Sequence, residues 1–222
     1  MPSTRTRYFP PSNFGMVEED LYRSSVPKLV NFPFLDTLQL RTIIYLSQDE
    51  PPNNLIGFCE EQKIDYIQPK AILDSVRNHS QTKLSTLPEE AVIQSLDMML
   101  DSRHYPVLVC CRLGRHKTGT VIGCLRKLQR WSLSSIFAEY HRFAPDTRPQ
   151  NEQFIELFDS DLVTQPRTPV RWFTILIEAH REVIESKSTN KLPTATHQPP
   201  QPNPQASKPA SSSLLDANPA HI

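Results

Sequence analysis

The chain has 222 residues and no formal net charge, since 24 basic side chains balance 24 acidic ones. This balance argues against a global attraction to nucleic acid or to a membrane surface, and no stretch approaches the roughly 18 apolar residues of a membrane span. The N-terminus lacks the apolar run of a secretory signal, so we expect a cytoplasmic protein. Its four cysteines lack metal-ligand spacing and are predicted to be thiols, with no metal site.

Composition divides the chain into four segments. Residues 1–7 are polar and are predicted to form a flexible N-terminus, and residues 8–165 carry the apolar patterns of one main domain. Residues 166–186 are predicted to form an amphipathic helix. Residues 187–222 are rich in Pro, Ser and Gln with few large apolar side chains, so this tail is predicted to be disordered.

Apolar runs of strand length alternate with helical patterns in the first half of the main domain. Residues 13–17 and 21–23 suit two short strands joined by an acidic turn. Residues 42–46 form a continuous apolar run, which is typical of a buried parallel strand. A helix over 51–63 and a strand over 64–67 follow, so this part of the sequence predicts a βαβ unit.

The second half predicts helices around one further strand. A helix begins at Pro88 with two acidic residues in its first turn. It leads to a short apolar strand, 106–109, that ends in two cysteines. A helix over 134–143, a loop over 144–149 and a helix from Asn151 follow in turn.

The stretch 107–120 has the pattern of a phosphate-binding loop. An apolar strand passes through a six-residue turn centred on Gly114 and enters a helix near Thr118. In such an arrangement backbone N–H groups point inward, and the helix N-terminus adds partial positive charge. The residues predicted to bind phosphate are Arg112, Leu113, Gly114, Arg115, His116 and Lys117.

Cys111 stands at the mouth of this predicted loop. The donors that hold a phosphate would also stabilise its thiolate, which is the nucleophilic form of cysteine. A thiolate that faces a bound phosphoryl group is placed for attack at phosphorus. The alternative interpretation is that Cys110 and Cys111 are small buried side chains that end a core strand. The glycine turn and its cationic residues favour the phosphate loop, because a buried strand gives no reason for them.

These motifs give the chain a resemblance to a known family. It resembles the plant and fungal atypical dual-specificity (tyrosine) phosphatases, in particular their fungal Oca-type group, over about residues 8–160. The signature of Cys-dependent phosphatases is His-Cys, five residues, then Arg followed by Ser or Thr. The segments that carry the resemblance are 9–14, 21–27, 31–35, 110–111, 117–119, 122–133 and 139–144. The resemblance implies an α/β fold with a central, mainly parallel sheet flanked by helices, and a Cys-containing phosphate-binding loop between strand and helix.

Two positions depart from the family signature. Cys110 stands where the family has His, and Lys117 stands where the family has a phosphate-clamping Arg. Arginine grips two phosphoryl oxygens with a planar fork, whereas lysine is a point charge on a flexible stem. Loss of one such donor typically lowers a rate by about 10²–10³-fold. Thr118 is retained, and the resemblance implies that its hydroxyl assists the thiolate as a leaving group.

The resemblance leaves two classes of function open. One is hydrolysis of phosphate esters or anhydrides, phosphotyrosine or inositol pyrophosphate, through a cysteinyl-phosphate on Cys111 without metal or cofactor. The other is a catalytically impaired pseudophosphatase that acts as a phosphate-binding or scaffolding subunit. The implied partners are a phosphorylated small molecule or phosphoprotein and, in a hetero-oligomer, related phosphatase-like proteins, with no nucleic acid and no membrane.

No motif marks the general acid that such a phosphatase needs. By position in the family the candidate is Asp74, with Asp65 and Asp49 as alternatives, and a solvated loop carboxylate is the other interpretation. Arg148 in the predicted loop 144–149 either reaches toward a phosphate on the ligand or is a solvated loop arginine.

The predicted C-terminal helix also has two interpretations. Its aromatic and aliphatic side chains, Trp172, Phe173 and Leu176 among them, fall near one stripe. The helix either packs on the main domain or offers a docking surface to a partner subunit, as the resemblance to a group whose members act together implies.

Overall fold

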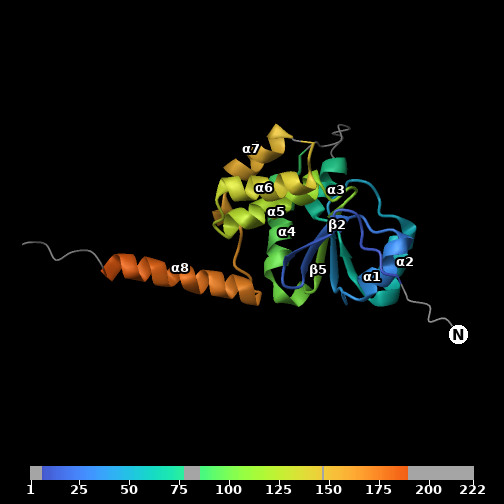
Figure 1. Ribbon diagram of the computed structural model, residues 1–222, viewed down its shortest axis with the longest axis horizontal. Helices are drawn as coiled ribbons and strands as arrows, with labels where there is room; N and C mark the ends of the chain where they lie inside the picture. Colours follow the sequence, from blue (N-terminus) through green and yellow to red (C-terminus); the bar gives the residue numbers. More distant parts are fainter. Residues whose placement is uncertain (1–6, 78–85, 147, 190–222) are drawn as a thin grey trace, which may run out of the picture.

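The computed structural model of the protein describes residues 7–77, 86–146 and 148–189. Within these residues the chain folds around a five-stranded sheet with helices on both faces (Figure 1). The strands are β1 (Gly15–Glu18), β2 (Leu21–Ser25), β3 (Thr42–Tyr45), β4 (Asp65–Ile67) and β5 (Val107–Cys111).

The sheet has the strand order β1-β2-β5-β3-β4. Only the β1–β2 pair is antiparallel, whereas β2–β5, β5–β3 and β3–β4 are parallel. The mainly parallel sheet predicted by the resemblance is therefore confirmed, and so is the predicted βαβ unit made of β3, the following helix and β4. The strand that carries the two cysteines occupies the centre of the sheet, where both of its neighbours run parallel to it.

The helices form two layers on the sheet (Figure 1). They are α1 (Phe32–Asp36), α2 (Asn53–Gln62), α3 (Lys70–Arg77), α4 (Glu89–Leu100), α5 (His116–Leu128), α6 (Leu133–Phe143), α7 (Pro149–Leu157) and α8 (Arg171–Thr189). Short 3₁₀ turns precede α1 at Leu29–Asn31, follow α4 at Ser102–His104 and follow α7 at Ser160–Leu162. None of the described helices is long and apolar enough to cross a membrane.

Alternating side chains of β5 point into two separate apolar clusters, as a strand with both faces covered requires. Val107, Val109 and Cys111 face the larger cluster, which α4 to α8 complete. Leu108 and Cys110 face a smaller cluster beneath α1 and α2. The two neighbouring cysteines therefore belong to opposite faces of the sheet.

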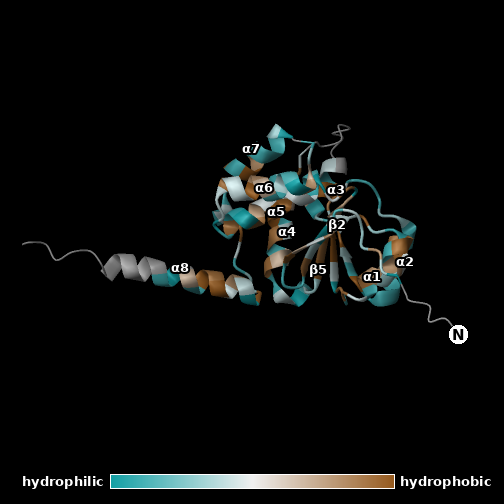
Figure 2. Cartoon of the chain, viewed as in Figure 1, coloured by the Kyte–Doolittle hydropathy of each residue, from teal (hydrophilic) through white to brown (hydrophobic). Residues whose placement is uncertain are grey.

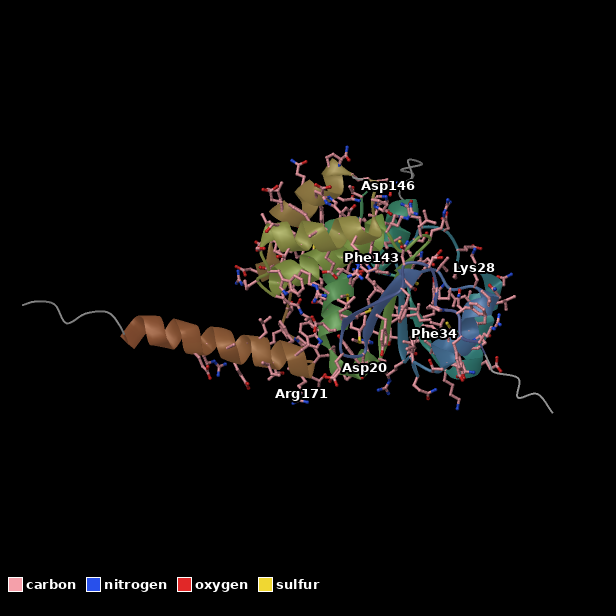
Figure 3. All side chains as sticks on the ribbon, viewed as in Figure 1. Asp20, Lys28, Phe34, Phe143, Asp146 and Arg171 are labelled. Carbon is pink, nitrogen blue, oxygen red and sulfur yellow. The ribbon has the colours of Figure 1, made fainter. Side chains whose placement is uncertain are left out.

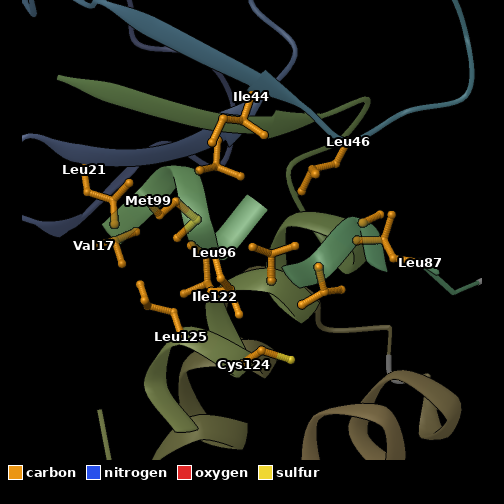
Figure 4. Close-up of a cluster of buried hydrophobic side chains, with 14 of the residues drawn as sticks. Val17, Leu21, Ile44, Leu46, Leu87, Leu96, Met99, Ile122, Cys124 and Leu125 are labelled. Atoms are coloured by element: carbon orange, nitrogen blue, oxygen red, sulfur yellow. The ribbon is translucent and has the colours of Figure 1, made fainter. Parts of the chain in front are cut away.

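The larger cluster joins the phosphate-loop helix to the sheet. Figure 4 shows Leu96 and Met99 of α4 meeting Ile122 and Leu125 of α5 below Ile44 of β3. All of these side chains are fully buried, and burial of each such side chain contributes roughly 1.5–3 kcal/mol. This packing fixes the position of the α5 N-terminus relative to the end of β5.

The region predicted as a loop around Asp74 is in part a helix. Residues 70–77 form α3, in which Ile72 is buried in the larger cluster and Asp74 is half-buried. Residues 78–85, which follow α3, are outside the described residues. A single buried isoleucine in the eight residues of α3 is too weak a periodic signal to predict the helix.

The C-terminal helix begins in the core and then leaves it. Val170 and Phe173 are buried in the larger cluster, and Trp172, Leu176 and Ile177 pack against it. Beyond this first part, Figure 1 shows α8 projecting away from the domain, and Figure 2 shows a hydrophobic stretch in the half of the helix nearer the domain. The interpretation in which the helix packs on the domain thus holds for its first turns. The helix continues to Thr189, three residues into the predicted tail.

A buried carboxylate anchors the approach to α8. Asp101 is 4% exposed and accepts hydrogen bonds from Arg103 Nε at 3.0 Å and from Thr168 Oγ1 at 2.7 Å. Backbone hydrogen bonds from Ser102 N to Thr168 O and from Val170 N to Leu100 O align the two segments. The bond to the Arg103 guanidinium holds the pKa of Asp101 well below its usual range.

We expect Asp101→Asn to lower the free energy of unfolding by about 1–3 kcal/mol at pH 7, because charged hydrogen bonds to a buried group are lost. Since the folded pKa is depressed, this stability is present above the unfolded value of about 3.9 and is lost as the pH falls through the folded pKa. The difference between the two proteins in urea unfolding should therefore narrow below about pH 4. Asp36→Asn, at an exposed site, is the control. An equal loss in both variants, or a loss that does not depend on pH, would contradict this role.

Candidate active site

The chain between β5 and α5 forms a loop, residues 112–115, at the carboxyl end of the central strand. Cys111 ends β5 and is 6% exposed. It opens into a cavity of about 490 Å³, within the range of roughly 300–1,000 Å³ that is typical of small-molecule sites. The residues that line it are Leu46, Ser47, Gln48, Asp49, Cys111, Arg112, Leu113, Arg115, His116, Lys117 and Arg148. The structure thus brings Cys111 together with five of the six predicted phosphate-binding residues, all except Gly114.

Strand alternation determines which cysteine faces this cavity. Cys111 points to the face covered by α5, whereas Cys110 lies in the cluster beneath α1 and α2. Burial raises the pKa of the Cys110 thiol well above its ordinary value, so this thiol stays protonated at neutral pH. The family histidine that Cys110 replaces would therefore sit on the far side of the strand from the cavity.

Gly114 brings the loop into contact with β2. Its φ is +66°, in the left-handed region that favours glycine. An added Cβ would lie 2.4 Å from the carbonyl carbon of Ser24 and from the nitrogen of Ser25. The start of the loop is also held in place, because Val26 N donates a hydrogen bond to Cys111 O at 2.8 Å. Only glycine fits this close approach of two backbones.

Two side chains hold the loop carbonyls on the side away from the cavity. Asn13 Nδ2 donates to Leu113 O at 2.8 Å, and Arg23 donates from one terminal nitrogen to Gly114 O at 3.1 Å. In a trans peptide the N–H lies opposite the preceding carbonyl, so the N–H of Arg115 points away from Arg23. This geometry presents a loop amide as a donor to an anion.

Arg23 places a buried positive charge beneath the loop. It is 1% exposed and its guanidinium carbon lies 3.7 Å from the centre of the Phe143 ring, an attractive cation–π geometry. Burial lowers its pKa to about 10, so the guanidinium is still protonated at neutral pH. Its Nε and second terminal nitrogen have no hydrogen-bond partner among the described residues, which leaves its charge incompletely compensated.

The first residue of α5 ties the loop to two later segments. His116 is 7% exposed, with its Nδ1 3.0 Å from Tyr140 Oη and its Nε2 3.0 Å from an oxygen of Asp146. Asn151 Nδ2 donates to the same tyrosine oxygen at 3.0 Å. The bond to His116 also holds the pKa of Asp146 below its usual range. Both ring nitrogens of His116 are used within the protein, which leaves its backbone N–H for a ligand.

The N-terminus of α5 is open to an anion. Arg115 is the N-cap residue of α5, but its side chain forms no hydrogen bond to the helix. The first N–H groups of α5 therefore keep their capacity to bind a phosphate. Thr118 in the first turn is fully buried, and its hydroxyl has no hydrogen-bond partner within the part of the chain that the structure describes. The helix begins at His116, two residues before the predicted start.

The three candidate carboxylates lie in different places. Asp49, in the segment after β3, lines the cavity with Cys111 and is 3.3 Å from the Ser47 hydroxyl. Asp74 lies on α3 and lines a separate hollow with Lys70 and Pro88. Asp65 is exposed on β4. The structure therefore brings Asp49, and not Asp74, to the rim of the phosphate loop. No group of three His, Cys, Asp or Glu side chains suited to a metal occurs among the described residues.

Sequence reasoning missed the residues that support the loop from elsewhere in the chain. These residues are Arg23 on β2, Tyr140 on α6 and Asp146 in the loop after α6, which contact the loop or its helix, and Asn151 on α7, which bonds to Tyr140. A charged residue inside the short apolar strand was the one available signal for Arg23. For Tyr140, Asp146 and Asn151, no local pattern in the sequence indicates that they lie near the phosphate-binding loop.

Comparisons with known proteins agree on one family. A sequence model of the tyrosine phosphatase family matches residues 8–176. A Dictyostelium discoideum protein named as the tyrosine-protein phosphatase DG1060 is 50% identical over 163 residues, which cover 73% of this chain and 95% of the relative. A Mycosarcoma maydis protein named as the tyrosine-protein phosphatase OCA1 is 47% identical over 156 residues, which cover 69% and 95%.

Two solved structures extend the comparison to the fold. The core catalytic domain of the PP-IP phosphatase SIW14 from S. cerevisiae, in complex with citrate, has a TM-score of 0.62 and 37% identity, covering 70% of this chain and 90% of that one. A second structure of the Siw14 catalytic core has a TM-score of 0.63 and 30% identity, covering 85% and 99%. These similarities and the sheet order confirm the fold that the resemblance implies.

We expect Gly114→Ala to lower the free energy of unfolding by roughly 1–3 kcal/mol, because the new Cβ overlaps the backbone of β2 and the residue keeps a positive φ. Displacement of the loop should also abolish saturable binding of inorganic phosphate. Gly57→Ala is the control: a Cβ there meets nothing within 4 Å, and alanine in a helix should be neutral or stabilising by about 0.5–1 kcal/mol. Thermal unfolding and calorimetric titration measure both quantities. Unchanged phosphate binding in Gly114→Ala would show that the contact with β2 does not shape the loop.

Proposed function

We propose that this chain, which belongs to the tyrosine phosphatase family, hydrolyses phosphate esters or anhydrides with Cys111 as nucleophile. The observation that carries the proposal is the position of Cys111. Its side chain opens into a cavity whose walls include an uncapped helix N-terminus, the loop and four cationic side chains: Arg112, Arg115, Lys117 and Arg148.

In the first step the Cys111 thiolate attacks phosphorus. A sulfur–phosphorus bond forms and the bond from phosphorus to the leaving oxygen breaks, so the phosphoryl group passes to Cys111. Loop amides and the N-terminus of α5 bind the phosphoryl oxygens, where negative charge must be stabilised in the transition state. Lys117 adds a positive charge at the end of the loop.

In the second step water attacks the cysteinyl-phosphate. The sulfur–phosphorus bond breaks, inorganic phosphate is released and Cys111 regains its thiolate. The buried Thr118 hydroxyl, which has no partner among the described residues, would donate a hydrogen bond to the departing sulfur. This role follows from the resemblance and is supported by the otherwise unsatisfied burial of the hydroxyl.

The leaving oxygen needs a proton in the first step. Among the described residues that line the cavity, Asp49 is the carboxylate, and we propose it as the general acid in preference to Asp74, which lines a separate hollow. General-acid catalysis typically contributes about 10²–10⁴-fold. Neither the reaction nor its binding site as proposed uses a metal or a cofactor.

The charge around the cavity favours a polyanionic substrate. One phosphoryl group can be bound by the loop amides alone, yet the wall adds four basic side chains against one carboxylate. Several phosphates on one ligand would use this excess. An inositol pyrophosphate fits this description, and it is the substrate class named for the similar yeast phosphatase. Phosphotyrosine is the alternative, as the family name suggests.

The scaffold interpretation has less support. The two relatives described above are named as phosphatases, and the loop keeps its nucleophile, its glycine and its open helix N-terminus. The replacement of arginine by Lys117 is the observation that favours an impaired enzyme. Assembly with related phosphatase-like proteins and a cytoplasmic location stay predictions.

The test is phosphate release by the purified, reduced protein from an aryl phosphate and from an inositol pyrophosphate. We expect release from at least one of them, with the inositol compound preferred, and we expect Cys111→Ser to reduce it to background while it still binds inorganic phosphate. Cys59→Ala, which removes a buried thiol from the opposite face of the sheet, should retain activity.

Two results would contradict the proposal. Activity that survives in Cys111→Ser would remove this cysteine from the reaction. Absence of release from both substrates, together with binding of the inositol compound, would identify a phosphate-binding scaffold.

A further inference from the structure

Position 117, where the family signature has an arginine, holds a lysine in this chain, yet an arginine from outside the loop lines the same cavity. Lys117 offers a point charge on a flexible stem, whereas arginine presents a planar fork that matches two phosphoryl oxygens. Arg148, at the start of α7, lines the cavity together with Cys111 and Lys117. Position 117 therefore has no planar fork, and Arg148 brings one to the rim of the cavity from outside the loop.

Two anchors hold the backbone on either side of Arg148 to the helix that carries the loop. Before it, Asp146 contacts His116 Nε2 at 3.0 Å. After it, the buried Asn151 donates to Tyr140 Oη, which in turn lies 3.0 Å from His116 Nδ1. Both anchors lead to His116, the first residue of α5, so a change in the position of the loop would move Arg148 with it.

The main chain of Arg148 is also fixed by the helix that follows it. Its carbonyl accepts hydrogen bonds from Asn151 N at 2.9 Å and from Glu152 N at 3.3 Å. These bonds close the first turn of α7. The Asn151 side chain fixes the same turn to α6 through its hydrogen bond to Tyr140 Oη. A side chain that starts from a fixed Cα loses less entropy when it binds a ligand.

The charge of Arg148 is available to a ligand. Arg115 pairs with Asp146 at 3.5 Å, whereas the Arg148 guanidinium forms no hydrogen bond or ion pair with another residue of the described chain. Figure 3 shows Asp146 at the opposite side of the domain from Arg171. Arg148 is exposed at this end, next to the cavity.

We propose that Arg148 grips the phosphoryl group in place of the arginine that is absent from the loop end. This inference rests on the proposed function, because it assigns a second phosphoryl-binding side chain to the same site. The guanidinium donates to phosphoryl oxygens on the open side of the cavity, while the loop amides and Lys117 bind from below. Asp146, His116, Tyr140 and Asn151 act as positioning residues for this arginine.

The experiment is a double-mutant cycle read by binding of inorganic phosphate. Calorimetric titration uses the full chain carrying Cys111→Ser, so the readout needs no hydrolysis. Arg148→Ala and Arg148→Lys are made with and without Lys117→Arg. The matched control is Arg171→Ala, because Arg171 is exposed at the start of α8, at the opposite side of the domain from Asp146. Circular dichroism checks that each variant is folded.

We expect Arg148→Ala to weaken phosphate binding roughly 10- to 100-fold, as loss of a charge-assisted contact does, and Arg148→Lys to recover only part of it. Arg171→Ala should bind as the parent does. In the Lys117→Arg background the loss from Arg148→Ala should shrink to less than about 3-fold, because the two arginines make the same contact and their effects are not additive.

Two outcomes would overturn the inference. Arg148→Ala that binds phosphate as tightly as Arg171→Ala would remove Arg148 from the site, and a loss of equal size in both backgrounds would show that it does not replace the loop arginine. Turnover of an aryl phosphate is measured separately on variants that keep Cys111. If turnover is absent while the binding cycle holds, the proposed hydrolysis is wrong and the assignment of Arg148 stands.

Discussion

The close approach of Gly114 to β2 is the contact on which the whole site depends. Because a Cβ at this position would lie 2.4 Å from the backbone of Ser24, the loop can turn back beneath itself only with glycine there. The turn directs the Gly114 carbonyl to the buried Arg23, and the same peptide then presents its N–H on the other side. One steric condition thus turns a connection between strand and helix into an anion-binding loop, with a buried cation below it.

The central strand connects this loop to the core by a second simple rule. Alternation along β5 sends Cys111 to the face where α5 begins and Cys110 to the opposite face. Nucleophile and buried thiol are therefore separated by the sheet although they are adjacent in sequence. Replacement of the family histidine by Cys110 changes the packing beneath α1 and α2, so its effect on Cys111 must pass through the backbone. The replacement of the family arginine by Lys117, in contrast, alters the wall of the cavity itself.

The sequence predicted what depends on neighbours along the chain. The strands, most of the helices and the phosphate loop follow local patterns: apolar runs, a glycine turn, and cations beside a cysteine. Local signals do not reach residues that tertiary contacts bring together. Asp74 was chosen by its place in the chain; it lies on α3 beside a separate hollow, whereas Asp49 lines the cavity from the segment after β3. The identity of the general acid stays a prediction. The partnership of His116 with Asp146 and Tyr140 joins residues that no periodic pattern connects.

The most direct test of the account is to trap the cysteinyl-phosphate. The reduced protein is mixed with an excess of substrate, quenched in acid within the first turnover, and examined by intact and peptide mass spectrometry. The account predicts the added mass of one phosphoryl group on the peptide that contains Cys111, its absence in Cys111→Ser, and its decay as phosphate is released. Phosphate release without any such adduct, or an adduct on another residue, would contradict it.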